Sequence, residues 1–303
     1  MKSRHLFIAS IILLSSCSKT NQDIPNPGNA AAISAVPSNF KQKILIENYT
    51  QTFCGQCPKA HYYIDSLLKM WPSTAYAVSI HVNDGLQAAT NVNLASGTNM
   101  LDSIYNTFNI YPGGPINRDI NSPIDLSPDL WFSKAQTKLG QIPSCGLAID
   151  ASEISANNHL NVIVHTGFSQ NMFGDYRLQG YIIEKTVASY DSTFDQLNDF
   201  SSQGVSPDTT LPFYNLNDTI NHYSYKYVLR KMIANSGVEG DGIPQAIMIK
   251  GNEFVKTYNV DLTGINWSNC LLVFFVDKYG ANGSTHLIEN VQQVPIGSIK
   301  NWN

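Results

Sequence analysis

Two cysteines separated by two residues, Cys54-Gly55-Gln56-Cys57, carry the clearest chemistry in this sequence. At this spacing two thiols can close a disulfide, and a pair that opens and closes can exchange electrons with other thiols. If a helix begins at the second cysteine, its free N–H groups and its dipole stabilise a thiolate and lower the thiol pKa. The pattern therefore predicts an exposed attacking thiol at Cys54 and a more buried resolving thiol at Cys57.

Two other uses of these residues stay open. Cys54, Cys57 and His61 also form C-x2-C-x3-H, which could hold a soft metal such as copper or zinc. No convincing fourth ligand accompanies them, and His61 is expected to be an exposed helix residue, so we predict neither a metal nor a cofactor. The second alternative is a permanent disulfide, although a ring of four residues constrains the unfolded chain only weakly.

The residues that must position the dithiol have the pattern of a strand, a helix and a second strand. Residues 44–46 are a short apolar run, typical of a central strand. After Cys57, apolar residues recur at the spacing of one helix face: Ala60, Ile64, Leu67 and Leu68. Pro72 ends this helix and residues 75–81 form the next strand. The dithiol is thus expected at the N-terminus of the helix in a βαβ unit.

Three further residues are candidates for supporting roles. Glu47 lies on the strand that leads to the dithiol; partly buried beneath Cys57, it would have a raised pKa and could accept the resolving thiol's proton. Pro112 and Pro115 compete for a cis peptide bond that would pack its preceding backbone against the disulfide turn. The alternatives are a solvated edge carboxylate and a plain Pro-Gly turn.

Residues 1–16 have the pattern of a secretory signal peptide. A positively charged start precedes the apolar run 6–14, which is too short to span a bilayer. The residues before Cys17, Leu14-Ser15-Ser16, are similar to the lipobox of bacterial lipoproteins, in which the chain is cut before a cysteine that carries the lipid. We therefore expect lipidation at Cys17 and a flexible tether over residues 17–39 that holds the folded part off a membrane surface. The compartment of the mature chain is expected to lie outside the cytoplasm, where disulfides can persist.

A wider resemblance is carried by four short motifs: Glu47-Asn48-Tyr49-Thr50, the run from Cys54 to Lys59, Ser79-Ile80-His81, and Pro112 six residues before Arg118. On these motifs residues 40–140 resemble a thioredoxin-like domain. The chain as a whole resembles the thioredoxin-like outer-membrane lipoprotein family of Bacteroidota-type bacteria. The resemblance implies a lipid-anchored protein of the outer membrane, on its periplasmic face or at the cell surface, and favours Pro112 over Pro115 as the cis-proline. Gln56 and Pro58 depart from the thioredoxin pattern, and residues at such positions tune the redox potential.

Beyond residue 140 the pattern changes to short apolar or alternating runs. Strands are predicted at residues 160–168, 176–184, 223–233, 245–250, 253–258, 270–276 and 286–294. Gly251-Asn252 is a hairpin signal between two of them. We therefore predict an α/β thioredoxin-like domain followed by an all-β (immunoglobulin-like sandwich) domain over residues 141–303. Cys145 and Cys270 lie in this half, either as a second disulfide or as two buried thiols.

Composition narrows the functional classes. The net charge is −4 and only 14% of residues are charged, which argues against the clustered basic surface of a nucleic-acid-binding protein. The first hypothesis is thiol–disulfide oxidoreductase-type activity on protein thiols or disulfides, at a membrane reached through the N-terminal lipid. The second is a non-catalytic binding or structural lipoprotein of the cell surface, which binds a surface protein partner and in which the dithiol is a permanent disulfide.

Overall fold

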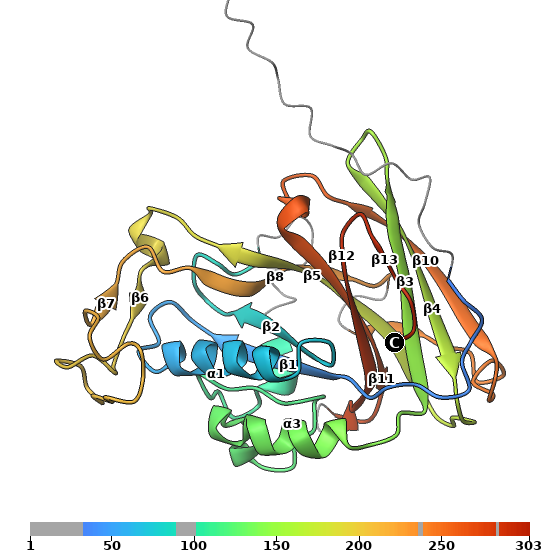
Figure 1. Cartoon of the computed structure of the whole chain (residues 1–303), viewed down its shortest axis with the longest axis horizontal. Helices are drawn as coiled ribbons and strands as arrows, with labels where there is room; N and C mark the ends of the chain where they lie inside the picture. Colours follow the sequence, from blue (N-terminus) through green and yellow to red (C-terminus); the bar gives the residue numbers. More distant parts are fainter. Residues whose placement is uncertain (1–32, 89–100, 236–238, 283–284) are drawn as a thin grey trace, which may run out of the picture.

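The computed structural model describes residues 33–88, 101–235, 239–282 and 285–303. These residues are rich in strands and contain few helices (Figure 1). The longest helices are α1 (Cys57–Met70) and α3 (Trp131–Leu139), and residues 101–105 are also helical. Short 3-10 helices cover Pro123–Leu126, Pro128–Leu130, Ser192–Phe194 and Trp267–Asn269.

A seven-stranded sheet joins the two halves of the chain. Its order is β1-β2-β8-β5-β11-β12, with β9 paired to β5. The strands are β1 (Ile44–Thr50), β2 (Ala75–His81), β5 (Tyr176–Val187), β8 (Tyr225–Ile233), β9 (Asp241–Gly242), β11 (Cys270–Lys278) and β12 (Ile288–Pro295). β1 and β2 are parallel along their whole length, whereas β2 meets β8 only at Ser79 and Val228. The first two strands are therefore one end of a sheet whose other strands lie beyond residue 140.

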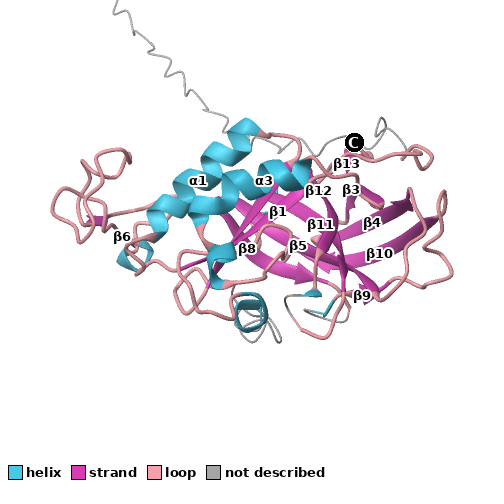
Figure 2. Ribbon diagram, turned by 90° about the horizontal axis from the view of Figure 1, so that it is seen from below, coloured by secondary structure: helices cyan, strands magenta, loops and turns pink. Residues whose placement is uncertain are grey.

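A four-stranded sheet packs against the larger one (Figure 2). Its order is β10-β4-β3-β13, with bounds Glu253–Asp261, His159–Phe168, Cys145–Ile154 and Ile299–Lys300. One buried apolar cluster joins the two sheets and includes Val162 of β4, Ile182 of β5 and Phe274 of β11. A short ribbon of β6 (Gln196–Leu197) and β7 (Thr219–Ile220) lies at the opposite end of the molecule from β10 (Figure 1).

The sequence predicts a chain rich in strands, and the described residues confirm this. Six of the predicted strand segments lie in strands β4, β5, β8, β10, β11 and β12. The prediction of a strand at residues 245–250 is wrong: these residues form turns, and the Ile247 N–H donates to the Pro244 carbonyl at 3.0 Å. The sheets do not separate at residue 140, because the open edge of β2 accepts β8. A division into folding units at that residue stays a prediction.

The strand, helix and strand around the dithiol form as the sequence predicts. Every residue of β1 and β2 is buried, so both faces of this part of the sheet are covered. Side chains alternate between the faces of a strand. Ile44 and Ile46 pack under α1 against Ile64, while Leu45 and Tyr49 belong to the apolar cluster on the opposite face. Side chains of β1 that point toward α1 are therefore separated by the sheet from those that point toward the opposite cluster.

Residues 113–116 run beside the outer edge of β1. Tyr49 and Gly113 exchange backbone hydrogen bonds, and Ile46 forms an antiparallel bridge with Ile116. The Gly114 carbonyl accepts a hydrogen bond of 2.8 Å from the indole of Trp131. A Cβ on Gly114 would lie 1.6 Å from a backbone carbonyl oxygen of β1, so only glycine allows this close approach.

Replacing Gly114 with alanine is expected to lower the free energy of unfolding by about 2–3 kcal/mol, because β1 and residues 113–116 must separate to admit the methyl group. Gly242→Ala is the matched control, since a Cβ there would have no neighbouring atom within 4 Å. The control should change stability by less than about 1 kcal/mol. Urea unfolding measures both, and equal losses would contradict the close-approach argument.

Candidate functional site

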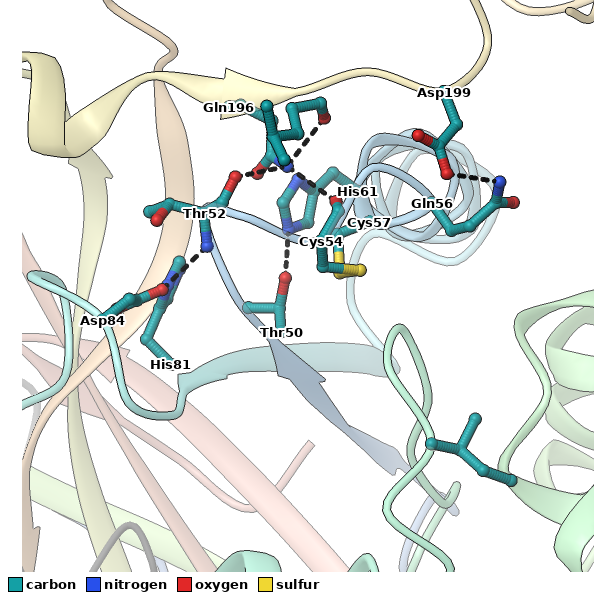
Figure 3. Close-up of a disulfide and its surroundings, with 12 residues drawn as sticks. Thr50, Thr52, Cys54, Gln56, Cys57, His61, His81, Asp84, Gln196 and Asp199 are labelled. Atoms are coloured by element: carbon teal, nitrogen blue, oxygen red, sulfur yellow. Dashed lines mark hydrogen bonds and ion pairs between the residues drawn. A yellow bond between two sulfur atoms is a disulfide. The ribbon is translucent and has the colours of Figure 1, made fainter. Parts of the chain in front are cut away.

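Cys54 and Cys57 are joined by a disulfide between the end of β1 and the start of α1 (Figure 3). Their Cα atoms are 5.4 Å apart. Cys57 is fully buried, whereas Cys54 is partly exposed. The difference in exposure is the one that an attacking and a resolving thiol would require.

The N-terminus of α1 supplies the electrostatics of the pair. Gln56 is the N-cap residue but its side chain makes no cap hydrogen bond, and Pro58 occupies the first turn, where its missing N–H costs nothing. No acidic side chain lies in that turn. No residue of the helix itself therefore offsets the positive end of its dipole, which would favour a thiolate at this point in the reduced protein; the nearby carboxylate comes from Asp199, outside α1.

A segment from far along the chain holds the dithiol loop in place (Figure 3). The buried side-chain amide of Gln196 donates to the Cys54 carbonyl at 2.9 Å. The backbone N–H of Asp199 donates to the Gly55 carbonyl at 2.9 Å, and its carboxylate accepts a hydrogen bond of 2.9 Å from Gln56. We call Gln196 and Asp199 the clamp, because they fix three consecutive residues of the loop.

A second set of contacts holds the residues just before the dithiol. The Asp84 carboxylate accepts hydrogen bonds from the backbone N–H of Thr52, at 2.9 Å, and from the backbone N–H of Leu86, at 2.9 Å. Its Oδ2 also lies 2.7 Å from Nδ1 of the buried His81. Sequence reasoning missed Asp84, although its position shortly after the 75–81 strand could have suggested it.

His61 is partly buried, and its prediction as an exposed helix residue is wrong. Its ring nitrogens lie 3.1 Å from the Thr50 hydroxyl and 3.2 Å from the Tyr223 hydroxyl. Burial, with smaller effects of His81 and Lys226, lowers the pKa of His61 to about 3. Within residues 33–88, 101–235, 239–282 and 285–303, no three His, Cys, Asp or Glu side chains gather as a metal site would require.

Glu47 lies on the face of β1 opposite α1, so the structure does not bring it together with Cys57. Both of its carboxylate oxygens accept hydrogen bonds from Arg118, at 2.9 and 3.0 Å, and the Tyr181 hydroxyl donates to it at 2.8 Å. Glu47 and Arg118 are fully buried. The two oxygens of Glu47 are engaged by Arg118 and Tyr181, on the face of the sheet away from the sulfur of Cys57.

Arg118 is the centre of a buried charge cluster. Besides Glu47, it pairs with Asp277 of β11 at 3.0 Å and donates to the Tyr105 hydroxyl at 2.9 Å. Its guanidinium carbon lies 4.0 Å from the centre of the Tyr105 ring and 4.8 Å from that of Phe275. Burial raises the pKa of Asp277 to about 7, against the lowering effect of Arg118. The sequence signalled Arg118 only through its spacing from Pro112.

The two candidate prolines differ in the structure. The Tyr111–Pro112 peptide bond is cis, which is the assignment favoured above, and Pro112 is partly exposed. Pro115 is buried in the segment beside β1, where its carbonyl accepts a hydrogen bond from the Glu47 N–H. The positioning role expected for Pro112 stays a prediction.

The remaining cysteines separate into two groups. Cys145 and Cys270 are buried and unbonded, so of the two alternatives the structure shows two separate thiols. Burial raises the pKa of Cys145 well above its ordinary value and that of Cys270 to about 12, which leaves both thiols protonated and unreactive. Cys17, the predicted lipidation site, lies outside the described residues.

Fold and site together define a strand-rich protein that carries a disulfide at the N-terminus of a helix. The model of the family of outer membrane protein Omp28 matches residues 98–300, which is more than half of the chain. The chain therefore belongs to the Omp28 outer membrane protein family, and this supports a location at the outer membrane. The matched residues begin after Cys57, so the dithiol lies outside them.

A solved structure from Porphyromonas gingivalis shows a related fold. HBP35 of Porphyromonas gingivalis is 16% identical, with a TM-score of 0.65 over 85% of this chain and 76% of that chain. A protein from Agrobacterium tumefaciens is 11% identical, with a TM-score of 0.49 over 88% of this chain and 97% of that chain. No curated protein sequence matches the chain. No helix in the described part of the chain is long and apolar enough to cross a membrane.

Replacing Arg118 with methionine is expected to lower the free energy of unfolding by about 3–5 kcal/mol, because Glu47 and Asp277 would remain buried without their cation. Arg177→Met is the control: its partners Asp175 and Glu239 are about half exposed. The control should cost at most about 1 kcal/mol. Urea unfolding at neutral pH compares the two variants, and similar losses would show that the Arg118 cluster does not hold the fold.

Asp277 gives a pH prediction. Its pKa of about 7 in the folded chain exceeds the ordinary value of 3.8, so between these values the folded chain holds a proton that the unfolded chain has lost. Stability from this group should therefore fall as pH rises from about 4 to 7, by at most about 1.4 kcal/mol per pH unit. Asp277→Asn should lack this component, measured by urea unfolding at several pH values. Parallel curves for variant and parent would contradict it.

Proposed function

We propose that this chain is a lipid-anchored extracytoplasmic protein that carries out thiol–disulfide exchange through Cys54 and Cys57. Residues 40–140 would act as a thioredoxin-like unit, and Cys17 would carry the lipid that attaches the chain to the outer membrane. One observation supports this most: a disulfide between a partly exposed Cys54 and a fully buried Cys57, at the N-terminus of α1. Protein thiols and disulfides outside the cytoplasm would be its partners.

In the reducing direction the reaction has two steps. The Cys54 thiolate attacks one sulfur of a substrate disulfide, forming a mixed disulfide and releasing the other substrate sulfur as a thiolate. Cys57 then attacks the Cys54 sulfur, which closes the Cys54–Cys57 disulfide and releases the second substrate sulfur. Two electrons pass from the dithiol to the substrate. The oxidising direction reverses both steps.

The proton of Cys57 needs an acceptor other than Glu47, whose oxygens are held by Arg118 and Tyr181. The substrate thiolate released in the first step is a base of suitable strength and is produced beside Cys54, so it can take up this proton. The proposed mechanism therefore has no protein carboxylate in the resolving step. Cys54 needs no base, because the α1 N-terminus favours its thiolate.

The clamp favours a second candidate function, in which the disulfide is permanent and the chain is a surface-binding lipoprotein. Gln196 and Asp199 hold the carbonyls of Cys54 and Gly55 from a segment more than 140 residues away. A loop fixed in this way resists the small movements that opening a disulfide requires. The two candidates therefore differ in whether the pair can be reduced and reoxidised.

The test is the capture of the intermediate by the full chain. Reduced Cys57→Ala should form a stable mixed disulfide with insulin through Cys54, because the resolving thiol is absent, whereas Cys54→Ala should form none. Cys270→Ala is the control, since this thiol is buried away from α1; it should retain the insulin-reducing activity of the parent chain with dithiothreitol as reductant. Mass spectrometry of the non-reduced adduct identifies the bond.

The reduction potential of the Cys54–Cys57 pair separates the two candidates. Thiol exchange predicts a value in the range of known catalysts, between about −270 and −120 mV. A value below about −300 mV, together with no insulin reduction and no trapped adduct, would contradict the proposed exchange and support the permanent disulfide.

A further inference from the structure

A cavity of about 260 Å³ lies beside α1, where β2 meets β8. Ser79, the one residue of β2 paired with β8, lines it. Because the two strands join at a single pair, the surface between them is not closed by a continuous ladder. Pro212 and Phe213, from the long segment between β5 and β8, contribute to the wall on another side.

The wall of this cavity is mainly aromatic. Tyr62 of α1, Phe213, Tyr223 and Tyr227 of β8 all line it, and the rings of Tyr62 and Phe213 meet edge to face at 6.5 Å. His61 also lines it, but both of its ring nitrogens are already engaged, so it is an uncharged part of the wall. Such a surface suits a compact apolar group.

One pair of opposite charges completes the lining. Asp65 of α1 and Lys226 of β8 lie 2.5 Å apart, with 27% and 48% of their side chains exposed. No other lining residue carries a charge at neutral pH. An ion pair that is this exposed contributes little to stability. Asp65 and Lys226 can therefore separate and bind other charged groups at a low cost in free energy.

We propose that this cavity binds a free amino acid with a large apolar side chain. Its ammonium group pairs with Asp65, its carboxylate pairs with Lys226, and its side chain lies against Tyr62, Phe213 and Tyr227. The volume is at the small end of ligand cavities, which fits a single amino acid and excludes a cofactor of nucleotide size. This assignment does not depend on thiol exchange at Cys54 and Cys57.

Charge complementarity favours a ligand with both charges. A cation alone would displace Lys226 from Asp65, and an anion alone would draw Lys226 away, so either leaves one charge of the wall without a partner. A zwitterion replaces one ion pair by two charge-assisted contacts. A neutral apolar molecule fills the aromatic part of the cavity but makes neither contact.

The test is calorimetric titration of the full chain with four probes of one side-chain type: L-phenylalanine, phenethylamine, 3-phenylpropanoate and N-acetyl-phenylalanine amide. L-Phenylalanine should bind about fivefold more tightly than each of the other three, since each of these lacks at least one of the two contacts and a partly exposed charged contact is worth up to about that factor. Asp65→Asn and Lys226→Met should each weaken L-phenylalanine binding at least about fivefold, since each removes one such contact. Circular dichroism confirms that the variants fold.

The matched control is the Lys59–Asp129 pair, which also joins α1 to a neighbouring segment, at 2.7 Å, but does not line the cavity. Lys59→Met and Asp129→Asn should leave L-phenylalanine binding unchanged. Three results would overturn the proposal: no binding of L-phenylalanine, equal binding of the neutral amide, or preferred binding of either singly charged probe. Preferred binding of phenethylamine would instead identify an aromatic cage for cations.

Discussion

The fully buried guanidinium of Arg118 connects parts of the chain that are far apart in sequence. It pairs with Glu47 of β1 and Asp277 of β11, and it contacts hydroxyl groups of Tyr105 and Tyr181. Burying a guanidinium and two carboxyl groups costs a large desolvation free energy, which their mutual hydrogen bonds and ion pairs offset. An arrangement of the strands that separated Glu47 or Asp277 from Arg118 would leave an unpaired charge in an apolar environment. We infer that the cluster selects the one packing of β1 against β5 and β11 in which every charge is paired.

The Arg118 cluster is important because, among the described residues, only one backbone pair joins β1 and β2 to the remaining strands of the sheet. β2 and β8 pair at Ser79 and Val228, whereas β5 pairs with β8 and β11 along most of its length. Side-chain contacts of the Arg118 cluster therefore connect β1 with β11, two strands that are not neighbours in the sheet. This cluster occupies one face of β1, and α1 with the disulfide occupies the other. The dithiol consequently has the helix N-terminus as its nearest source of electrostatic stabilisation, without a buried carboxylate beneath it.

Local sequence patterns predicted the residues around the disulfide well. The start of α1 at Cys57 and the strands on both sides of it depend on residues within one short stretch. Apolar periodicity and proline chemistry act over such distances, so a single sequence records them. The cis bond at Pro112 is different: the local sequence left Pro112 and Pro115 open, and only the family resemblance favoured Pro112. The segment 245–250 shows the limit: it has the composition of a strand, but it forms turns from which Met248 and, in part, Ile247 pack on the core while Ile249 is exposed.

Contacts over long sequence distances could not be predicted in the same way. From the local sequence Glu47 is a candidate proton acceptor, but in the fold it pairs with Arg118, 71 residues later. His61 has the character of a solvent-exposed helix residue until Tyr223, 162 residues later, covers it. In each case the chemistry of a side chain is set by a partner that no local pattern identifies. Buried polar residues are the hardest to predict, because the free-energy cost of burying them depends on which hydrogen-bond partner the fold provides.

The segment between β5 and β8 supplies several of these distant partners without belonging to either large sheet. It leaves and re-enters the sheet at Val187 and Tyr225, and its regular structure is limited to a 3-10 helix at Ser192–Phe194 and the short strands β6 and β7. Through Gln196 and Asp199 it fixes the loop of the disulfide, and through Phe213 and Tyr223 it forms part of the cavity beside α1. Its ends are held by strand pairing, so its residues can vary while the strands stay in register. One segment outside the sheets therefore contacts both the disulfide loop and the cavity.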